Sequence, residues 1–438
     1  MKKIVLTILT VAALGRAYAQ NPPAAKPQAG AIALTGATIH VGTGQVINNG
    51  VIVFDKGIIT AIGDANTPTT GASVINVSGK HVYPGLISPA ATVGLQEYAS
   101  VRATLDFNEV GVINPNIRAL VAYNTDSEVI PTIRNNGVLL TQAMPLGGTI
   151  SGSSSIMQTD GWNWEDAVLK KDDGIWLNWP GYYSREFNFE DFSVGLRKNS
   201  RREAAINSLL ATFSEAKAYA AQKTVTPINL KFEAMRGLFS GASNLYIRAD
   251  YAKDIIEAVK FAKEAGVQKI VMVGADEAHR VASFLKDNSI PVILSPLHRL
   301  PNRQDEDVDL PYKMPGILQK AGVTVALSYN EEWWRTRNLP FLAGTAAGFG
   351  VTDREEALKM ITANAAKIMG VDNVVGTLEK GKHATLFVSK GDALDMRTNV
   401  VEQVYIQGRT VDLDDKHKRL YKIYKDKYEG QKPLAEKK

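Results

Sequence analysis

The side chains suited to metal or acid–base chemistry are few in this chain and widely spaced. Its 438 residues include no cysteine and 6 histidines: His40, His81, His279, His298, His383 and His417. No two of these stand in the His-x-His or His-x₃-His spacing that brings two imidazoles to one metal ion. Without cysteine, a thiolate nucleophile, a disulfide and a cysteine zinc site are all excluded.

Three polar residues that follow predicted strands are the candidates for catalysis: Arg248, Asp250 and His298. Active sites of parallel barrels lie at the carboxyl ends of the strands, so these side chains would share one mouth. A guanidinium holds a carboxylate or polarises a carbonyl, and a carboxylate or imidazole moves a proton. Each also fits a structural role, as a solvated loop charge or a histidine bonded to backbone. Further acids near predicted strand ends are Glu97, Asp276, Glu331 and Glu332.

Repeated strand–helix units predict the fold from Val82 onward. Short apolar runs alternate with helical stretches, which indicates a parallel sheet with helices outside it. The number of units suits a closed barrel better than an open sheet, and no Gly-x-Gly-x-x-Gly motif follows the first strand. The predicted units are strands 82–87, 137–142, 244–248, 269–273, 291–294 and 323–327, and helices 252–265, 277–287, 314–321, 339–348 and 354–369.

Short strand patterns flank this region on both sides. They cover residues 31–40, 50–54, 58–62 and 72–77 before it, and 375–378, 384–388 and 400–407 after it. We therefore predict an α/β protein whose residues 84–373 form a (β/α)8 TIM-type barrel. A composite β-sandwich domain would be formed by both chain ends, residues 31–83 plus 374–413.

The first residues predict export. A basic start precedes an apolar run, Ile4–Leu14, that is too short to span a bilayer, and small residues around Ala19 offer a cleavage site. We expect a signal peptide over residues 1–19, a Pro- and Ala-rich linker over residues 20–30, and a periplasmic or secreted protein. No other apolar run is long enough for a transmembrane helix.

Charge is concentrated at the carboxyl end. The formal net charge is +5, and removal of the signal with its three cations leaves 5 − 3 = +2. No basic field covers the fold, so we expect no nucleic-acid partner. The tail, residues 414–438, holds nine Lys/Arg and five Asp/Glu, and Leu420, Ile423, Tyr424 and Tyr428 recur in it at helical spacing. This predicts a basic amphipathic helix that docks on its own barrel, on a partner or, with a second signal, on a membrane.

Two segments show no regular pattern. Residues 161–199 are rich in tryptophan, tyrosine and phenylalanine, and fit a lid, a self-packed excursion or an oligomer contact. The stretch Gly147–Ser155 is rich in glycine and serine, and backbone N–H groups of such a stretch can cradle an anion. It lacks the Lys-Ser/Thr ending of a nucleotide loop. The stretch is either a flexible connection or pocket lining, with Gly147, Gly148, Ser151 and Gly152 as the candidate pocket residues.

Three motifs, in this order, resemble the amidohydrolase superfamily, and within it the imidazolonepropionase-like and dipeptidase-like branch. Residues 79–87 (GKHVYPGLI) resemble the start of the first barrel strand, residues 364–370 (NAAKIMG) the last barrel helix, and residues 376–384 (GTLEKGKHA) the return to the β domain. The resemblance extends from about Ala31 to Val411. It implies a barrel that holds one or two divalent metals such as zinc, whose activated water attacks a C–N bond.

The chain departs from this resemblance wherever a metal ligand is expected. The corresponding positions are Ala90, Thr92, Arg248, Gly274 and, for the last aspartate, Asn330 or Tyr329. Methyl, hydroxyl, guanidinium and bare backbone make no ligand set for a dication. We therefore predict no metal and no other cofactor.

Two functions remain open. The first is a metal-free pseudoenzyme that binds a small ligand, or that partners an active amidohydrolase in a hetero-oligomer or itself in a homo-oligomer. The second, implied by the resemblance, is a hydrolase of C–N bonds in cyclic amides or small dipeptides, with altered chemistry around Arg248, Asp250 and His298. The first is favoured, because a site without a metal also lacks the activated water.

Overall fold

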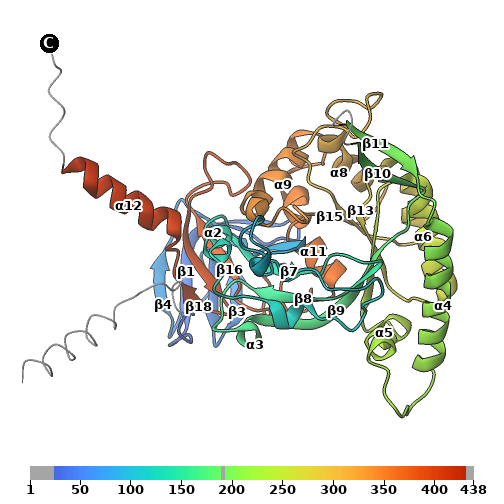
Figure 1. Cartoon of the computed structure of the whole chain (residues 1–438). Coiled ribbons are helices and arrows are strands. Elements are labelled where there is room, and N and C mark those ends of the chain that lie inside the picture. The colour runs from blue at the N-terminus through green and yellow to red at the C-terminus, as the bar shows by residue number, and fades with distance from the viewer. Residues whose placement is uncertain (1–23, 189–192, 431–438) are drawn as a thin grey trace, which may run out of the picture.

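Two large sheets organise the chain. The computed structural model describes residues 24–188 and 193–430 (Figure 1). The predicted signal peptide lies outside these residues. One eight-stranded sheet is built by the two chain ends and another by the middle, and a smaller sheet pairs β10 (Tyr183–Asn188) with β11 (Ser193–Lys198). In the part of the chain that the structure describes, no helix has both the length and the apolar character needed to cross a membrane.

The first sheet joins strands from both ends of the chain. Its order is β18-β17-β16-β5-β1-β2-β3, and β4 pairs with β1. Its strands are β1 (Ile32–His40), β2 (Val46–Asp55), β3 (Ile58–Gly63), β4 (Ser73–Asn76), β5 (His81–Pro84), β16 (Leu386–Ser389), β17 (Val401–Ile406) and β18 (Arg409–Val411). Leu34, Ile52, Phe54 and Leu386 fill one core of this sheet. The two chain ends therefore share a sheet, and a sandwich of two sheets remains a prediction.

The predicted strand over residues 375–378 is absent. Val375 and Leu378 are buried, as an apolar strand pattern requires. Between them Gly376 has a φ of +93°, which is outside the extended region of the backbone. The apolar side chains here belong to a loop that packs against the core. Apolar residues can be buried in this way without hydrogen bonding to a neighbouring strand.

The second sheet is a nearly closed barrel, in the order β15-β14-β13-β12-β9-β8-β7-β6. Its strands are β6 (Leu86–Ala91), β7 (Val138–Ala143), β8 (Ile150–Gln158), β9 (Val168–Asn178), β12 (Asn244–Ala249), β13 (Ile270–Gly274), β14 (Val292–Leu294) and β15 (Val325–Leu327). The predicted barrel is confirmed in its general form. It is not parallel throughout, because β8 is antiparallel to both β7 and β9. A meander therefore replaces two strand–helix units.

A short segment, Met360–Ile361, lies between the first and last barrel strands. The amide of Ile87 donates to the carbonyl oxygen of Ile361 over 2.8 Å, and that of Leu327 to Met360 over 3.2 Å. The hydroxyl of Ser328 adds a 2.5 Å bond to the carbonyl oxygen of Pro89. The predicted helix 354–369 is interrupted at this segment, into α10 (Arg354–Lys359) and α11 (Ala363–Met369), because these carbonyl groups pair with strands.

Most of the remaining helices surround the barrel (Figure 1). They are α2 (Val129–Arg134), α3 (Trp164–Ala167), α4 (Arg202–Ala220), α5 (Leu230–Ser240), α6 (Ala252–Ala265), α7 (Ala282–Asp287), α8 (Leu310–Lys320) and α9 (Leu339–Gly348). Helix α6 has the predicted bounds. It buries Ile255, Ala258, Val259 and Ala262, at the spacing that places apolar side chains on one helix face.

The aromatic segment 161–199 is more regular than its sequence indicates. It contains α3, β9, β10 and β11, and Trp176 of β9 is buried inside the barrel. Four charged residues, Lys170 to Asp173, follow the first two residues of β9 and obscure its strand pattern. The prediction that no regular unit occurs here is wrong. The first half of β9 is a strand because it pairs with β8, although its sequence has no apolar run.

Helix α12 (Lys416–Glu429) extends away from the rest of the molecule (Figure 1). Its first turn is attached, since Lys416 pairs with Glu128 over 2.6 Å and Lys418 Nζ donates to Asn135 over 2.6 Å. No residue of the helix is buried. The predicted helix is present, and within the described chain these contacts with its own barrel are confined to the first turn.

Candidate functional site

A cavity of about 450 Å³ opens at the carboxyl end of strands β12 to β15, which we call the barrel mouth. Nine residues singled out in the sequence line it: Arg248, Asp250, Gly274, Asp276, His298, Tyr329, Asn330, Glu331 and Glu332. Each belongs to a barrel strand or to the residues that follow one, so the shared strand direction brings together positions up to 84 residues apart (332 − 248). This is the geometry by which such barrels collect a site.

Ala90 and Thr92 do not line the mouth cavity. Both are fully buried. Ala90 has a φ of 52°, and its amide donates to Oε1 of Gln142 over 2.9 Å. The hydroxyl of Thr92 lies 3.4 Å from the carbonyl oxygen of Glu331. The two positions where the resemblance places a histidine pair are therefore closed off within the protein.

The glycine-rich stretch is also outside the cavity. Gly147 and Gly148 precede β8, whereas Ser151 and Gly152 are part of that strand and not of a loop. The side-chain amide of Asn178 donates to the carbonyl oxygen of Gly148 over 2.8 Å and to Oγ of Ser151 over 3.1 Å. The stretch thus presents acceptors to Asn178, and it takes a strand position because β7 and β9 supply partners on both sides.

Arg248 is the most firmly held charge at the mouth. Its guanidinium lies 5.2 Å from the centroid of the Trp176 ring, and Nη2 lies 2.8 Å from the sulfur of Met144. Nη1 donates to Oε1 of Glu331 over 2.5 Å. Burial lowers the pKa of Arg248, and the Glu331 carboxylate opposes this shift. The arginine side chain is 20% exposed and that of Glu331 58%, so the cation is fixed and its counter-ion faces solvent.

His298 has both ring nitrogens engaged. Its Nε2 lies 2.8 Å from the hydroxyl of Thr345, which donates its own proton to the carbonyl oxygen of Phe341. Nε2 therefore carries the hydrogen, and Nδ1 accepts the hydroxyl of Tyr329 over 3.0 Å. Burial, with a contribution from Arg335, lowers the pKa of His298, and burial raises the pKa of Tyr329. The pair is a neutral imidazole held by a protonated phenol.

Two further arginines at the mouth were missed by the sequence reasoning. Arg299 pairs with Asp276 over 2.9 Å, and Arg335 pairs with Glu332 over 3.1 Å. Arg299 directly follows His298, so its place after a predicted strand was a usable signal, whereas Arg335 lies beyond the strand ends in a region without pattern. With Arg248 the lining holds three guanidinium groups, against the carboxylates of Asp250, Asp276, Glu331 and Glu332. The mouth is dipolar and suits a polar ligand.

The residues at the mouth do not fit a divalent metal. Within residues 24–188 and 193–430, no three His, Asp or Glu side chains are grouped in a way that could hold one. The Arg248 guanidinium stands at the mouth, and a cation there would face a fixed positive charge. Gly274 offers no side chain to bind a metal, and both nitrogens of His298 are engaged by hydroxyl groups. We therefore derive no chemical step through a metal.

A buried polar network, also missed, crosses the barrel below Arg248. Asp173 accepts hydrogen bonds from the hydroxyl of Tyr246 over 2.6 Å, from Ser154 over 2.7 Å and from Gln142 over 2.8 Å. Burial raises the pKa of Asp173. Tyr246 stacks on Trp176 with ring centroids 4.8 Å apart. The network thus supports the ring on which Arg248 rests.

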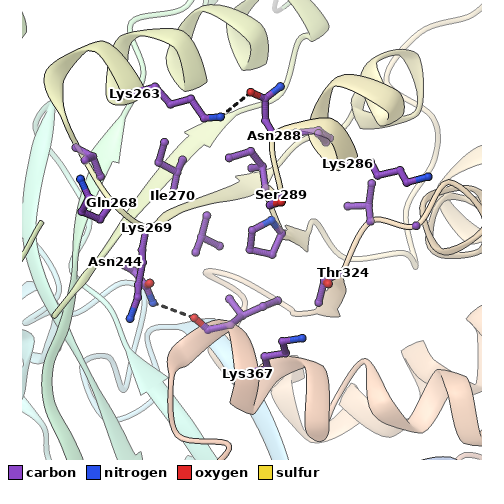
Figure 2. A pocket seen from close by; sticks show the side chains of 18 residues that line it. Asn244, Lys263, Gln268, Lys269, Ile270, Lys286, Asn288, Ser289, Thr324 and Lys367 are labelled. Carbon is purple, nitrogen blue, oxygen red and sulfur yellow. Dashed lines mark hydrogen bonds between the residues drawn. The ribbon is translucent and has the colours of Figure 1, made fainter. Parts of the chain in front are cut away.

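A second cavity, of about 520 Å³, lies at the opposite end of the same strands (Figure 2). Four lysines line it, and three of them, Lys263, Lys286 and Lys367, stand in the last turns of α6, α7 and α11. Helix carboxyl ends carry a partial negative charge that lysines balance. Lys263 also donates to Asn288 over 2.6 Å (Figure 2). We interpret these lysines as helix-end stabilisation, since their charge is already matched.

Comparison with known proteins places this geometry in context. The family described as "Amidohydrolase family" matches residues 350–412. An imidazolonepropionase from Flavobacterium psychrophilum is 29% identical over 112 residues, which are 24% of this chain and 27% of that protein. The match therefore spans about a quarter of the relative's length.

Similarity of fold extends much further than similarity of sequence. The crystal structure of an amidohydrolase from Thermotoga maritima MSB8 has a TM-score of 0.75 at 24% identity, over 87% of this chain and 99% of that chain. A Xaa-Pro dipeptidase with bound methionine has a TM-score of 0.53 at 16% identity, over 87% of this chain and 100% of that one. The two solved structures show the barrel fold. The match to the amidohydrolase family model is local and covers residues 350–412.

Proposed function

We propose that this protein is a ligand-binding pseudoenzyme of the amidohydrolase superfamily, which holds a small polar molecule at the barrel mouth without a metal. The single observation that carries the proposal is the setting of Arg248. Trp176 and Met144 hold its guanidinium in place, while its counter-ion Glu331 is 58% exposed. A carboxylate from solution can take the place of Glu331 with little rearrangement, and arginine binds carboxylates with two parallel hydrogen bonds.

A second group at the mouth indicates a ligand donor. Oδ1 of Asn330 is buried and has no hydrogen-bond partner among the described residues. An unmet buried acceptor is unfavourable, and once the Asn330 side chain turns towards the cavity an N–H or O–H group of a ligand would satisfy it. Arg248 and Asn330 line the same 450 Å³ cavity, which has the size of a small-molecule site. We infer a ligand that carries a carboxylate and a nearby N–H, as an N-acyl amino acid or a dipeptide does.

His298 supports binding over turnover. A general base needs a free lone pair within reach of the proton that it takes. The Nδ1 lone pair of His298 already accepts the Tyr329 hydroxyl, and Nε2 donates to Thr345. The imidazole is therefore best suited to holding Tyr329 at the cavity wall.

Calorimetric titration with two matched sets of compounds tests the proposal. One set consists of N-acetyl amino acids and dipeptides with a free carboxylate, and the other of the same compounds with an amidated carboxyl end. We expect saturable binding of the first set only. Arg248→Met should weaken it at least ten-fold, since a hydrogen bond to a charged group contributes about 1.5–3 kcal/mol. Arg397→Met, at an exposed arginine outside the cavity, should bind as the parent does.

Equal binding of both compound sets, or unchanged binding by Arg248→Met, would refute the assignment of Arg248. If no compound binds, the ligand class is wrong. The variant must be shown to remain folded by thermal unfolding, because Arg248 also packs on Trp176.

The second candidate function is hydrolysis of C–N bonds in cyclic amides or small dipeptides. The partial likeness to an imidazolonepropionase and the fold shared with a dipeptidase favour it. Elemental analysis of the purified protein, with product analysis on a panel of cyclic amides and dipeptides, separates the two functions. Near-unit zinc, iron or manganese with metal-dependent turnover would establish the hydrolase. A metal-free protein without turnover would leave the binding function.

Export and pairing with an active relative are further proposals. The basic and apolar start of the chain supports cleavage near Ala19, which amino-terminal sequencing of the protein from separated cell fractions would test. Co-expression with an active amidohydrolase from the same cell would test pairing, by asking whether a mixed oligomer survives gel filtration.

A further inference from the structure

Helix α12 presents an apolar face that stays exposed in the described chain. Leu420 is 41% exposed, Ile423 61%, Tyr424 53% and Tyr428 59%. Residues 420, 424 and 428 are spaced by four, so they lie along one side of the helix, and residue 423 lies next to them. Large apolar side chains that gather on one exposed face mark a surface that binds something.

Helix α12 is basic as a whole, and three of its lysines lie on the face opposite the apolar one. Within Lys416–Glu429 the chain has six Lys/Arg and two Asp/Glu, a net charge of 6 − 2 = +4. Lys418, Lys422 and Lys425 follow a spacing of three to four residues that places them away from the apolar side. Lysines on one face and tyrosine, leucine and isoleucine on the other are typical of helices that lie in a membrane interface.

The contacts of α12 with the rest of the protein hold its first turn, and the later turns are exposed. Asp415 caps the helix by accepting the amide of Lys418 over 2.8 Å, and Lys416 pairs with Glu128. Beyond Arg419, which bonds Asp414, the helix has no partner on the barrel or the sheet that the structure describes. A helix of 14 residues without buried side chains is only marginally stable in water, so contact with a surface would consolidate it.

A second copy of the chain is a poor occupant for this face. A helix of 14 residues is about 21 Å long and about 10 Å wide, so one face covers roughly 200 Å². Stable interfaces bury about 800 Å² on each partner. Two such helices side by side would also bring two charges of +4 together. An anionic surface, in contrast, attracts the lysines and accepts the tyrosines at its headgroup level.

We propose that α12 binds the surface of an anionic lipid membrane, with its apolar face in the headgroup region and its lysines against the lipid charges. The helix lies in the interface and does not span it. The barrel is then held beside the membrane by the contacts of Lys416 and Lys418 with Glu128 and Asn135. The proposal is independent of the function proposed for the barrel mouth.

Co-sedimentation of the full chain with two kinds of vesicle tests this. One kind contains phosphatidylglycerol and phosphatidylcholine, the other phosphatidylcholine alone. We expect at least ten-fold tighter binding to the anionic vesicles, and a loss of that difference when the salt concentration is raised. Two variants, Leu420→Ser/Ile423→Ser/Tyr424→Ser and Lys422→Glu/Lys425→Glu, should each lower anionic binding at least ten-fold. The apolar run at residues 4–14 is common to all of these proteins, so the differences isolate α12.

The matched control is Leu210→Ser/Lys223→Glu, which alters an exposed apolar side chain and an exposed lysine elsewhere on the surface. It should bind vesicles as the parent does. The proposal is overturned if the α12 variants bind like the parent, or if all variants bind both kinds of vesicle equally. Sedimentation velocity without lipid tests whether a second copy of the chain binds this face instead. If the parent forms a dimer that the α12 variants abolish, and the parent does not bind vesicles, the face belongs to a second copy.

Discussion

A carboxyl group deep in the barrel has more hydrogen-bond donors around it than an ordinary core position. Asp173 is fully buried and is reached by the hydroxyls of Tyr246 and Ser154 and by the amide of Gln142. Gln142 in turn holds the backbone of Ala90, where the chain adopts a positive φ. The side chain of residue 173 thereby fixes the backbone of the first barrel strand.

Replacement of Asp173 tests this role. Asp173→Ala removes the acceptor that three buried donors share, and each donor left unsatisfied lowers the free energy of unfolding by about 1–3 kcal/mol. Asp173→Asn keeps an acceptor in place and, because burial raises the pKa of Asp173, also removes the cost of a buried charge. We expect the asparagine variant to be more stable than the alanine variant by at least about 1 kcal/mol in urea unfolding. Equal losses would show that the network contributes little.

The histidines predict how stability depends on pH. Burial lowers the pKa of His81, His279, His298 and His383 below the value of about 6.5 expected in the unfolded chain. As the pH falls through 6.5, these histidines bind protons in the unfolded chain but stay neutral in the folded chain. The free energy of unfolding therefore falls. The melting temperature should therefore drop between pH 7.5 and 5.5. His298→Gln should flatten that drop, while His417→Gln, at an exposed position on α12, should leave the slope as it is.

At the residue scale, the sequence predicts which side chains gather at the mouth but not how they are used. Arg248 lies near the end of β12, Asp250 and His298 follow strands, and strand direction alone brings the three together. The engagement of His298 by Tyr329 and Thr345 depends on two other segments of the chain. The network of Asp173 was missed because a run of charged residues normally indicates exposure to solvent, and only the pairing of β8, β9 and β12 encloses Asp173.

Strand β9 shows how closely the barrel elements approach each other. A methyl group added at Gly174 would lie 2.4 Å from the ring of Tyr246 and 2.7 Å from the carbonyl oxygen of Asn244. Neither atom can move freely, because Tyr246 is stacked on Trp176 and Asn244 is part of β12. The glycine is needed for the fit between β9 and β12.

A matched pair of glycine substitutions measures this fit. Gly174→Ala should destabilise the protein by about 1–3 kcal/mol through overpacking. Gly195→Ala, in strand β11, meets nothing within 4 Å and should change stability by less than about 0.5 kcal/mol. Thermal unfolding of the two variants beside the parent gives the comparison. A loss at residue 195 as large as at residue 174 would point to a general cost of alanine in strands and not to the contact with Tyr246.

At the scale of elements, the sequence predicts the bounds of a helix or strand well where its apolar residues recur with a single regular spacing. Helix α6 and helix α9 (Leu339–Gly348) have the bounds that the sequence predicts. Strand β8 was missed, because its run of glycine and serine has no apolar alternation, although all nine of its residues are buried. Its strand conformation comes from neighbours on both sides, which a local pattern does not contain.

The barrel and the terminal sheet are joined by a buried cluster of charges around Asp160. Its carboxylate lies 2.9 Å from Arg409 of β18 and 3.6 Å from Arg134 of α2, and it also accepts the amide of Ala25 over 3.2 Å. The side chain of Asp160 is 3% exposed. One carboxylate thus connects the barrel, the sheet and the segment that precedes β1.

Removal of this connection should affect the whole molecule. Asp160→Ala leaves two buried guanidinium groups short of a counter-ion and should cost about 3–5 kcal/mol. Glu402→Ala removes the pair of Glu402 with Lys80, whose side chains are about one-third exposed, and should cost at most about 1 kcal/mol. Urea unfolding followed by two probes, tryptophan fluorescence for the barrel and limited proteolysis for the sheet, would show whether the two parts separate. Similar losses in both variants would contradict a special role for Asp160.

The whole-molecule arrangement was predicted from the order of motifs and not from their contacts. The strands before and after the barrel share one sheet, as their flanking positions indicate. The Asp160 cluster was not foreseen, because its members come from three distant parts of the chain and each looks like a surface charge in sequence. The amphipathic character of α12 was foreseen, while the limit of its barrel contacts to the first turn depends on where the sheet ends.

The shared sheet has a consequence for how the chain is made. Val82 of β5 pairs with Val388 of β16, a separation of 388 − 82 = 306 residues. Ribosomes add about 5–20 residues per second, so the N-terminal strands wait roughly 15–60 s for their neighbour to be synthesised. During that interval one side of β5 is an open edge, the kind of surface on which nascent chains stick to each other. We expect a messenger truncated before the codons of β16 to yield insoluble product, and a holdase chaperone to be required until the last strands emerge.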